Sequence, residues 1–249
     1  LHRTEGQDTA RLSATASWKL PITTDGGHLI TLFANVRGDA YYVTDTTPGA
    51  DAETITRGLT WGGFEWRYPL VRSDWGWKQV IEPIVQVIGA PYGGNPPEIP
   101  NEDSGAFEFD ETNLFSFNKF PGIDRWETGP RVNAGFRAAA YFDEGFVEAI
   151  IGESFRLHED DAFTQESGLR GQQSDYVGRL TLQPTNDIRV VHRFRVNQQD
   201  YSFERNEVYA EASDPEDYLM RVGYVLLEPN PALPEQREEV NLLGSFRTV

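Results

Sequence analysis

The sequence predicts an all-β fold, an antiparallel up-and-down sheet of about eleven strands that forms a curved, incomplete piece of a transmembrane β-barrel wall. Apolar and polar residues alternate with a period of two along most of the chain, whereas the 3.6-residue period of helices is nearly absent. Most alternating segments are about nine residues or longer, compared with about five or six in soluble sheets. Short turns also alternate with longer connections, as in barrels whose two rims differ.

The alternation defines the strands one by one. Residues 10–20 place Ala, Leu and Trp on one face and Ser, Thr, Arg and Lys on the other, and residues 129–142 repeat this division. The other predicted strands span residues 28–43, 59–71, 78–89, 146–157, 175–183, 188–197, 201–211, 219–227 and 238–247. Pro83 lies inside one of them, and because proline lacks the N–H that a ladder needs, we expect a bulge or a locally weak pairing there.

The connections between these strands fall into two classes. Tight turns rich in Asp, Asn, Gly and Ser are predicted at residues 23–27, 74–76, 143–145, 185–187 and 213–217. Longer loops are predicted at residues 46–57, 92–128, 158–173 and 229–236, and only the short connection 197–200 breaks the rule. Aromatic residues near the short turns fit an interfacial girdle, namely Trp18, Trp75, Trp77, Tyr141 and Phe142.

Residues 92–128 form a connection much longer than the usual limit of about 12–15 residues, beyond which loops are mostly functional or disordered. A wide barrel has too few inward side chains to fill its bore. We therefore expect this segment to fold over or into the mouth as a plug or lid. Its interior would contain Phe107, Phe109, Phe115, Phe117 and Phe120, with Asp124 and Arg125 fixing it through charge-assisted hydrogen bonds and Pro97, Pro100 and Pro121 stiffening it.

The polar face of the predicted strands carries charges of both signs. In a barrel these side chains would face a water-filled lumen and pair across strands. They are Arg37, Asp39, Glu65, Arg67, Glu82, Arg131, Arg137, Glu148, Arg156, Asp175, Arg179, Arg193 and Arg195. Periodicity alone does not separate this arrangement from a soluble β-sandwich with a solvated exterior.

Composition excludes several function classes. The balance of 22 Lys and Arg against 39 Asp and Glu gives a net charge of −17, which argues against binding to nucleic acid or to anionic bilayer surfaces. The absence of cysteine excludes disulfides, thiolate zinc sites and cysteine nucleophiles. No catalytic motif is present, the acidic run 158–161 departs from a calcium-loop spacing, and we predict no enzyme activity, metal site or cofactor. No apolar run reaches the roughly 18 residues of a membrane helix.

The segment 82–138 resembles the LptD family of lipopolysaccharide-assembly proteins of the bacterial outer membrane, and flanking pieces agree in order over essentially the whole chain. Flanking agreement includes the sequences "WRYP", "GES", "SGLRGQQSDYVGRL" and "RFRVNQQDYSFERNEV". The resemblance rests most on Pro100, Asn101, Glu102, Asp103, Ser104, Asn113, Leu114, Phe115, Gly122, Asp124 and Arg125. The Asn-Glu-Asp-Ser form is similar to alphaproteobacterial members.

The resemblance implies an integral outer-membrane barrel, surrounded by outer-membrane lipid, that inserts lipopolysaccharide into the outer leaflet. It also implies a plug lipoprotein (LptE) as partner, and a periplasmic domain that receives lipopolysaccharide from a periplasmic bridge protein. Because Leu1 is not an initiator methionine and the alternation continues towards Val249, we expect residues 1–249 to be the central part of one barrel domain, without the periplasmic domain and the barrel ends. Pro69 and Pro83 are therefore not expected to be the prolines of the family's lateral gate.

Two other functions fit the pattern of the residues. A general outer-membrane porin or siderophore-type channel predicts a constricting loop and measurable ion conductance. A soluble β-sandwich that binds or hydrolyses carbohydrate predicts solubility without detergent.

Overall fold

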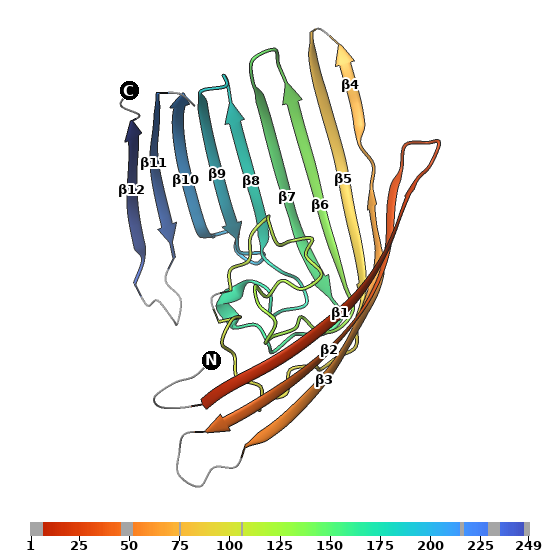
Figure 1. The fold of residues 1–249 in the computed structure, drawn as a ribbon. Helices are drawn as coiled ribbons and strands as arrows, with labels where there is room; N and C mark the ends of the chain where they lie inside the picture. The colour runs from red at the N-terminus through yellow and green to blue at the C-terminus, as the bar shows by residue number, and fades with distance from the viewer. Residues whose placement is uncertain are drawn as a thin grey trace.

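A computed structural model describes residues 7–45, 52–74, 76–105, 107–214, 217–228 and 235–246. These residues form one antiparallel sheet in which strands follow one another in sequence order, as the alternation predicted (Figure 1). The strands are β1 (Gln7–Thr23), β2 (Leu29–Asp45), β3 (Glu53–Arg67), β4 (Leu70–Asp74), β5 (Trp77–Gly89), β6 (Arg131–Tyr141), β7 (Phe146–Arg156), β8 (Tyr176–Gln183), β9 (Ile188–Val196), β10 (Phe203–Asp214), β11 (Tyr218–Leu227) and β12 (Arg237–Phe246). A short 3-10 helix, η1 (Gln165–Ser167), lies between β7 and β8.

The sheet has twelve strands rather than about eleven because the predicted strand 59–71 is divided. β3 and β4 both pair with β5, in the same register on either side of an interruption at Tyr68 and Pro69. The interruption lies opposite Glu82 and Pro83, and a single hydrogen bond, from Tyr68 N–H to the Pro83 carbonyl (3.2 Å), crosses it. The expected weak pairing at Pro83 is therefore present. β3 also begins at Glu53, earlier than predicted.

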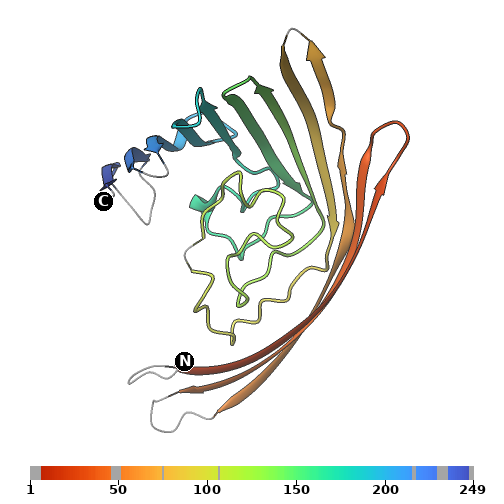
Figure 2. The same ribbon diagram turned by 45° about the horizontal axis from the view of Figure 1, so that its top comes forward.

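The sheet is a single curved layer and does not close. Within the described residues β1 pairs only with β2 and β12 only with β11, so the path β1-β2-β3-β5-β6-β7-β8-β9-β10-β11-β12 has an unpaired edge at each end. Figure 2 shows the strands following an arc, with the β5–β6 and β7–β8 connections on its concave side. In the described part of the chain, no helix has the length and apolar character needed to span a membrane.

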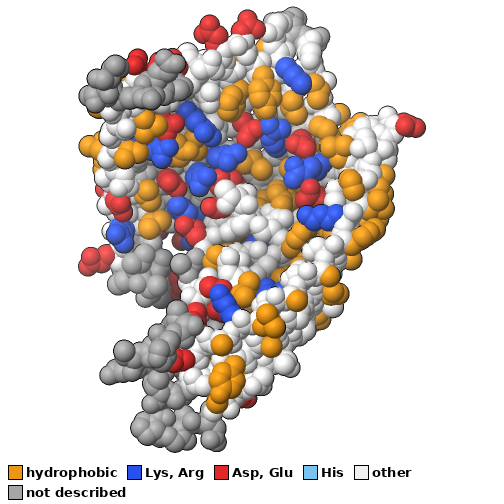
Figure 3. All heavy atoms as spheres, viewed as in Figure 1, with side chains coloured by type: hydrophobic (Ala, Val, Ile, Leu, Met, Phe, Trp, Pro, Cys, Tyr) orange, Lys and Arg blue, Asp and Glu red, His pale blue; other side chains and the backbone are white. Residues whose placement is uncertain are grey.

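The two faces of the sheet differ in polarity. Charged side chains gather on the concave face over β5–β10 (Figure 3). The convex face exposes large apolar side chains, among them Leu12, Val36, Ile81, Phe136, Ile151, Leu180, Val208, Met220 and Leu242. Leu12 is 75% exposed and Leu242 is 80% exposed. The described residues contain no second sheet that covers this face, so the β-sandwich alternative is wrong.

The aromatic residues near the short turns divide between the two faces. Trp77 and Phe142 stack with ring centroids 5.5 Å apart, and the Trp18 and Phe142 side chains are half exposed. Tyr141 instead lies on the concave face, where its hydroxyl accepts a hydrogen bond from Arg137 (2.8 Å). Trp75 lies outside the described residues. The expected girdle is therefore only partly represented on the convex face.

Two glycines of β3 provide a matched test of the close contact between β3 and β5. A Cβ on Gly63 would overlap the Val87 carbonyl oxygen in β5, whereas a Cβ on Gly58 would meet no atom within 4 Å. We expect Gly63→Ala to lower the free energy of unfolding of the full-length protein in detergent by about 1–3 kcal/mol or more, and Gly58→Ala to have little effect. Equal stabilities of the two variants, measured by urea unfolding, would contradict the observed β3–β5 contact.

Candidate functional site

The candidate site is the long connection 90–130 together with the concave face that it covers. Three apolar clusters attach it to the sheet, and the third and smallest joins Ile99 to Tyr41 and Val43 of β2. In the first, Trp126 packs against Trp61 of β3 (ring centroids 4.4 Å apart), and Phe117 packs against Phe33 of β2 (4.5 Å). In the second, Phe109, Leu114 and Phe120 pack with Phe163 and Leu169 of the β7–β8 connection and with Val177 of β8. Phenylalanines of the connection thus pack against the wall and against the β7–β8 connection.

A clip between two parts of the connection gives it its shape. The Asp103 carboxylate accepts hydrogen bonds from the N–H groups of Ile123 (3.0 Å) and Asp124 (3.0 Å) and from the Ser104 hydroxyl (2.9 Å). Gly122 is required beside it, because a Cβ at this position would overlap the Asp103 carboxylate. Burial by itself would raise the pKa of Asp103, but these hydrogen bonds, and that from Arg11, lower it to about 2.

Arg57 of β3 connects this clip to the wall. Its guanidinium donates to three backbone carbonyls of the connection, those of Gly94 (3.1 Å), Ile123 (2.6 Å) and Asp124 (3.0 Å). Asp39 of β2 accepts hydrogen bonds from both Arg57 (2.8 Å) and Arg37 (2.7 Å), so one buried carboxylate holds two cations and orients them towards the connection. Arg57 thus binds backbone carbonyls of the connection rather than its side chains, and these bonds fix the position of the clip.

The Asp124 carboxylate adds a second link to the wall. It accepts hydrogen bonds from Arg11 of β1 (2.8 Å), from the Tyr41 hydroxyl of β2 (3.3 Å) and from the N–H of Glu102 (2.9 Å). Arg11 also bonds Asp103 (2.7 Å). Arg125, in contrast, donates to the Ile99 carbonyl (2.9 Å) within the connection. The expected charge-assisted anchoring thus involves Asp124 on the wall side and Arg125 on the loop side.

A fully buried charge cluster lies where the connection returns to β6. Glu127 is 0% exposed and contacts Lys119 (3.1 Å), Arg131 (3.2 Å) and Arg156 (2.7 Å). Arg156 also pairs with Asp160 of the β7–β8 connection (3.4 Å). Three cations therefore share two carboxylates, and the cluster ties both connections to β6 and β7.

The excess of cations in this cluster explains why Glu127 is ionised although it is buried. Burial would raise the pKa of Glu127, but the charges of Arg131, Lys119 and Arg156 lower it to about 2. Burial lowers the pKa of Lys119 to about 8, with Glu127 opposing this shift and the two arginines reinforcing it. Glu127 is therefore ionised at neutral pH and is the carboxylate on which the cluster depends.

Ion pairs continue from this region across the concave face. Arg67 pairs with Glu65 (2.7 Å) and approaches Glu82 (3.8 Å), and Arg137 lies between Glu82 (3.5 Å) and Glu148 (2.9 Å). Arg179 of β8 then bonds Glu148 (3.0 Å). Charges of alternating sign thus connect β3, β5, β6, β7 and β8, so the predicted pairing across strands is observed on this face.

Acidic residues of the connection reach the far side of the arc. Glu111 lies between Arg179 of β8 (3.5 Å) and Arg193 of β9 (3.4 Å), and Glu108 pairs with Arg205 of β10. Burial raises the pKa of Glu111, against the attraction of Arg193. Asp175, outside the connection, pairs with Arg195 (3.4 Å). The connection is thus attached at both β1–β3 and β8–β10.

The structure divides the predicted site residues into two groups. Arg37, Asp39, Glu82, Arg131, Arg156 and Asp175 are buried, whereas Glu65, Arg67, Arg137, Glu148, Arg179, Arg193 and Arg195 are half-buried on the open part of the concave face. Among the motif residues, Asn113 joins Asp110 and Glu108 through hydrogen bonds, and Asn101 accepts one from the Ser104 N–H (3.0 Å). Pro100 is half-buried, Leu114 is fully buried, and the Phe115 carbonyl accepts from Gln86 (2.9 Å).

Sequence reasoning missed four residues of the site. Arg57 lies in the predicted loop 46–57, but the strand that carries it begins earlier, at Glu53. Arg11 lies on the polar face of a predicted strand, so the alternation could have identified it. Lys119 and Glu127 lie in a segment without periodicity and have no local signal. Among the described residues, no group of His, Asp and Glu is suited to hold a metal ion.

The buried cluster predicts the cost of removing its carboxylate. We expect Glu127→Gln to destabilise the attachment of the connection by about 3–5 kcal/mol, because three buried cations would share only Asp160. Hydrogen exchange of backbone amides 95–127 in the full-length protein should become correspondingly faster. Asp161→Asn is the control, since that exposed carboxylate pairs only with Arg170 at the surface. Equal exchange in both variants would contradict the role of Glu127.

The pKa of Asp103 predicts how the clip responds to acid. Its folded value of about 2 lies below the ordinary 3.8, so the carboxylate stabilises the clip fully above about pH 4 and loses this effect as the pH falls through about 2. Pepsin, normalised to an unfolded substrate, should cleave the connection increasingly as the pH drops across this window. In Asp103→Asn the dependence should be flatter and cleavage at pH 4 faster; an unchanged profile would refute the assignment.

Residues 1–248 match the family model LptD, described as LPS transport system D. No curated protein matches the chain. Family membership implies an outer-membrane protein that binds lipopolysaccharide and works with other components of the same transport system. The chain therefore belongs to the LptD family, whose function is lipopolysaccharide transport and outer-membrane assembly.

Proposed function

We propose that this chain is the central part of the barrel wall through which lipopolysaccharide is inserted into the outer leaflet. The observation that carries the proposal is the polarity of the single curved sheet, apolar on its exposed convex face and charged on its concave face. Lipid tails would cover the convex face, and the concave face would line the bore. The unpaired edges of β1 and β12 would continue into further strands of the same barrel.

Residues 92–128 act in this proposal as a fixed plug. The segment is attached to β1–β3 through Arg57 and Asp124 and to β8–β9 through Glu111. A mobile lid would instead have few buried contacts and a solvated backbone. A fixed plug closes a wide bore to small solutes without preventing lateral release of lipopolysaccharide elsewhere in the wall.

Membership of the family supports two further partners in this proposal. A plug lipoprotein, LptE, would occupy the part of the bore that the connection leaves open, and a periplasmic bridge protein would deliver lipopolysaccharide through a periplasmic domain. The ladder interruption at Pro69 and Pro83 is held in register on both sides, so we place the lateral gate elsewhere. The Asn-Glu-Asp-Ser sequence at 101–104 supports an alphaproteobacterial origin.

Deleting residues 95–127 from the full-length protein tests the plug. In cells that depend on this variant, we expect a several-fold lower inhibitory concentration of bulky antibiotics with lipopolysaccharide still reaching the surface. Gly122→Ala, which displaces Asp103, should have the same effect to a smaller degree, and Gly105→Ala, whose Cβ meets no atom within 4 Å, should have none. Unchanged permeability with normal assembly would remove the plug. Loss of surface lipopolysaccharide on depletion of the whole protein tests the transport function itself.

A further inference from the structure

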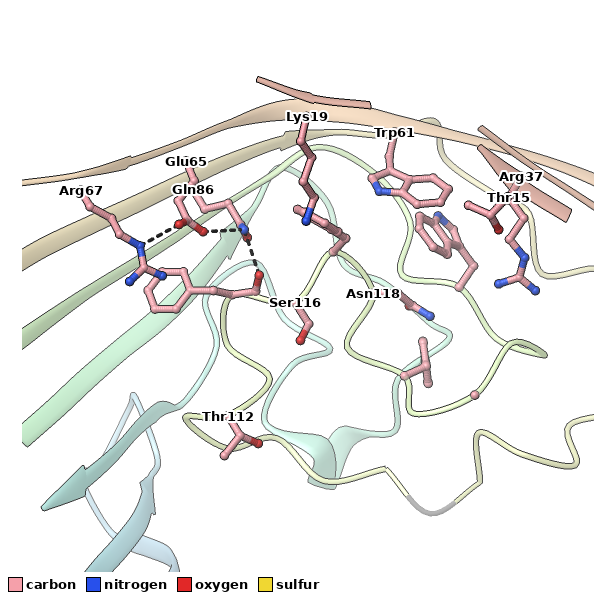
Figure 4. Close-up of a pocket in the computed structure, with 15 residues that line it drawn as sticks. Thr15, Lys19, Arg37, Trp61, Glu65, Arg67, Gln86, Thr112, Ser116 and Asn118 are labelled. Atoms are coloured by element: carbon pink, nitrogen blue, oxygen red, sulfur yellow. Dashed lines mark hydrogen bonds and ion pairs between the residues drawn. The ribbon is translucent and has the colours of Figure 1, made fainter. Parts of the chain in front are cut away.

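A cavity of about 670 Å³ lies between the wall and the connection. Strands β1, β2, β3 and β5 form one side, and residues 112–126 of the connection form the other. Figure 4 shows Lys19 and Trp61 projecting from the strands towards the loop segment that carries Ser116 and Asn118. The volume of this cavity lies in the range of small-ligand pockets, roughly 300–1,000 Å³.

Two buried donors that line this cavity lack acceptors. The indole N–H groups of Trp61 and Trp126 have no hydrogen-bond partner among the described residues, although Trp61 is only 9% exposed and Trp126 only 3% exposed. The Asn35 amide nitrogen, on the residue directly opposite Trp61 in the β2–β3 register, is likewise buried without an acceptor. A buried N–H without an acceptor is costly, so the two indole groups of the lining indicate an acceptor supplied from outside the protein.

A cation accompanies these donors. The Lys19 ammonium lies over the Phe117 ring, 5.1 Å from its centroid, and no described carboxylate pairs with it. The one acidic residue of the lining, Glu65, is already engaged by Arg67 (2.7 Å) and by the Gln86 amide (3.2 Å). In a chain with a net charge of −17, the cavity therefore presents an uncompensated positive charge.

The two side-chain amides of the lining, Asn118 and Gln86, are satisfied. Asn118 donates to the Arg125 carbonyl (3.2 Å) and accepts from the Glu127 N–H (2.9 Å). Gln86 donates to the Phe115 carbonyl (2.9 Å) and accepts from Asn133 (2.7 Å). The unsatisfied groups are thus donors, which suits a ligand rich in acceptors and disfavours a peptide, whose N–H groups would need acceptors in turn.

We propose that this cavity binds an acidic sugar, a saccharide unit bearing a phosphate or a carboxylate. Lys19 would pair with the anionic group, and the indole N–H groups would donate to it or to ring oxygens. Trp61 and Trp126 pack on each other and are nearly buried, so they would contribute through their N–H groups rather than through their ring faces. This inference rests on the proposed function, because the saccharide portion of lipopolysaccharide would then contact the inner wall of the barrel at β1–β3.

The test uses the full-length protein in detergent, titrated with rough-type lipopolysaccharide, with the same material after removal of its phosphates, and after reduction of its carboxyl groups. We expect Lys19→Gln to weaken binding of native lipopolysaccharide about tenfold, as for a lost charge-assisted hydrogen bond. Lys19→Arg should retain binding. Trp61→Phe, which removes the N–H but keeps an aromatic ring, should weaken binding severalfold. Lys19 is exposed, so its substitution does not disturb a core.

Controls are available on the same chain. Lys78→Gln removes a lysine near the short turn before β5, far along the strand from the cavity, and Trp18→Phe changes an indole exposed on the convex face. Both should bind like the wild type. If the wild type and Lys19→Gln bind one of the treated lipopolysaccharides equally, the group removed by that treatment is the one that Lys19 binds. This comparison identifies the anionic group as phosphate or carboxylate.

The outcomes separate this inference from the proposed function. Equal binding by the wild type and Lys19→Gln, or undiminished binding after both anionic groups are removed, would overturn the cavity assignment and leave transport intact. Failure of the wild-type protein to support surface lipopolysaccharide in depleted cells would overturn the proposed function. Saturation of the cavity by an acidic peptide in place of lipopolysaccharide would also overturn the assignment.

Discussion

The packing of the long connection on the curved sheet depends on the neutralisation of charge on the concave face. Arginines on the concave face are stable beneath a covering segment only if carboxylates or carbonyl oxygens meet them there, since an unpaired buried charge is costly. The connection between β5 and β6 supplies these acceptors. Asp124 meets Arg11, Glu127 meets Arg131 and Arg156, and backbone carbonyls meet Arg57. These ion pairs and hydrogen bonds therefore hold the connection on the wall.

The distribution of these contacts has a mechanical consequence. The connection begins and ends at β5 and β6, near the middle of the arc, but its charged contacts lie on both sides, at β1–β3 and at β8–β10. A segment attached at two separated places resists both straightening and tighter curling of the sheet. Since adjacent strands alone leave the curvature of an open sheet soft, the connection helps to set the radius of the wall.

The cavity beside β1–β3 contrasts with these saturated contacts. In the Glu127 cluster, Lys119 and Arg156 each pair with the Glu127 carboxylate, and the cluster is buried between the connection and the wall. In the cavity the same two surfaces leave indole N–H groups and an ammonium without acceptors. Among the described residues, these unmatched donors beside an unpaired ammonium are consistent with a ligand-dependent site in the cavity.

The sequence by itself determined the strands, their two faces and the aromatic interior of the long connection, because alternation and burial of phenylalanine are local patterns. It located β1, β2 and β5–β12 closely, and it marked the weak pairing at Pro83 from the missing N–H. The predicted strand starts later than β3 because Thr54, Thr56 and Gly58 carry no apolar signal. Arg57 was therefore not predicted to lie in a strand. Only the tertiary structure decided which charges meet. Arg11 and Asp124 are separated by 113 residues, and Lys119 reaches Glu127 through a fold without periodicity, so no local pattern specifies either pair.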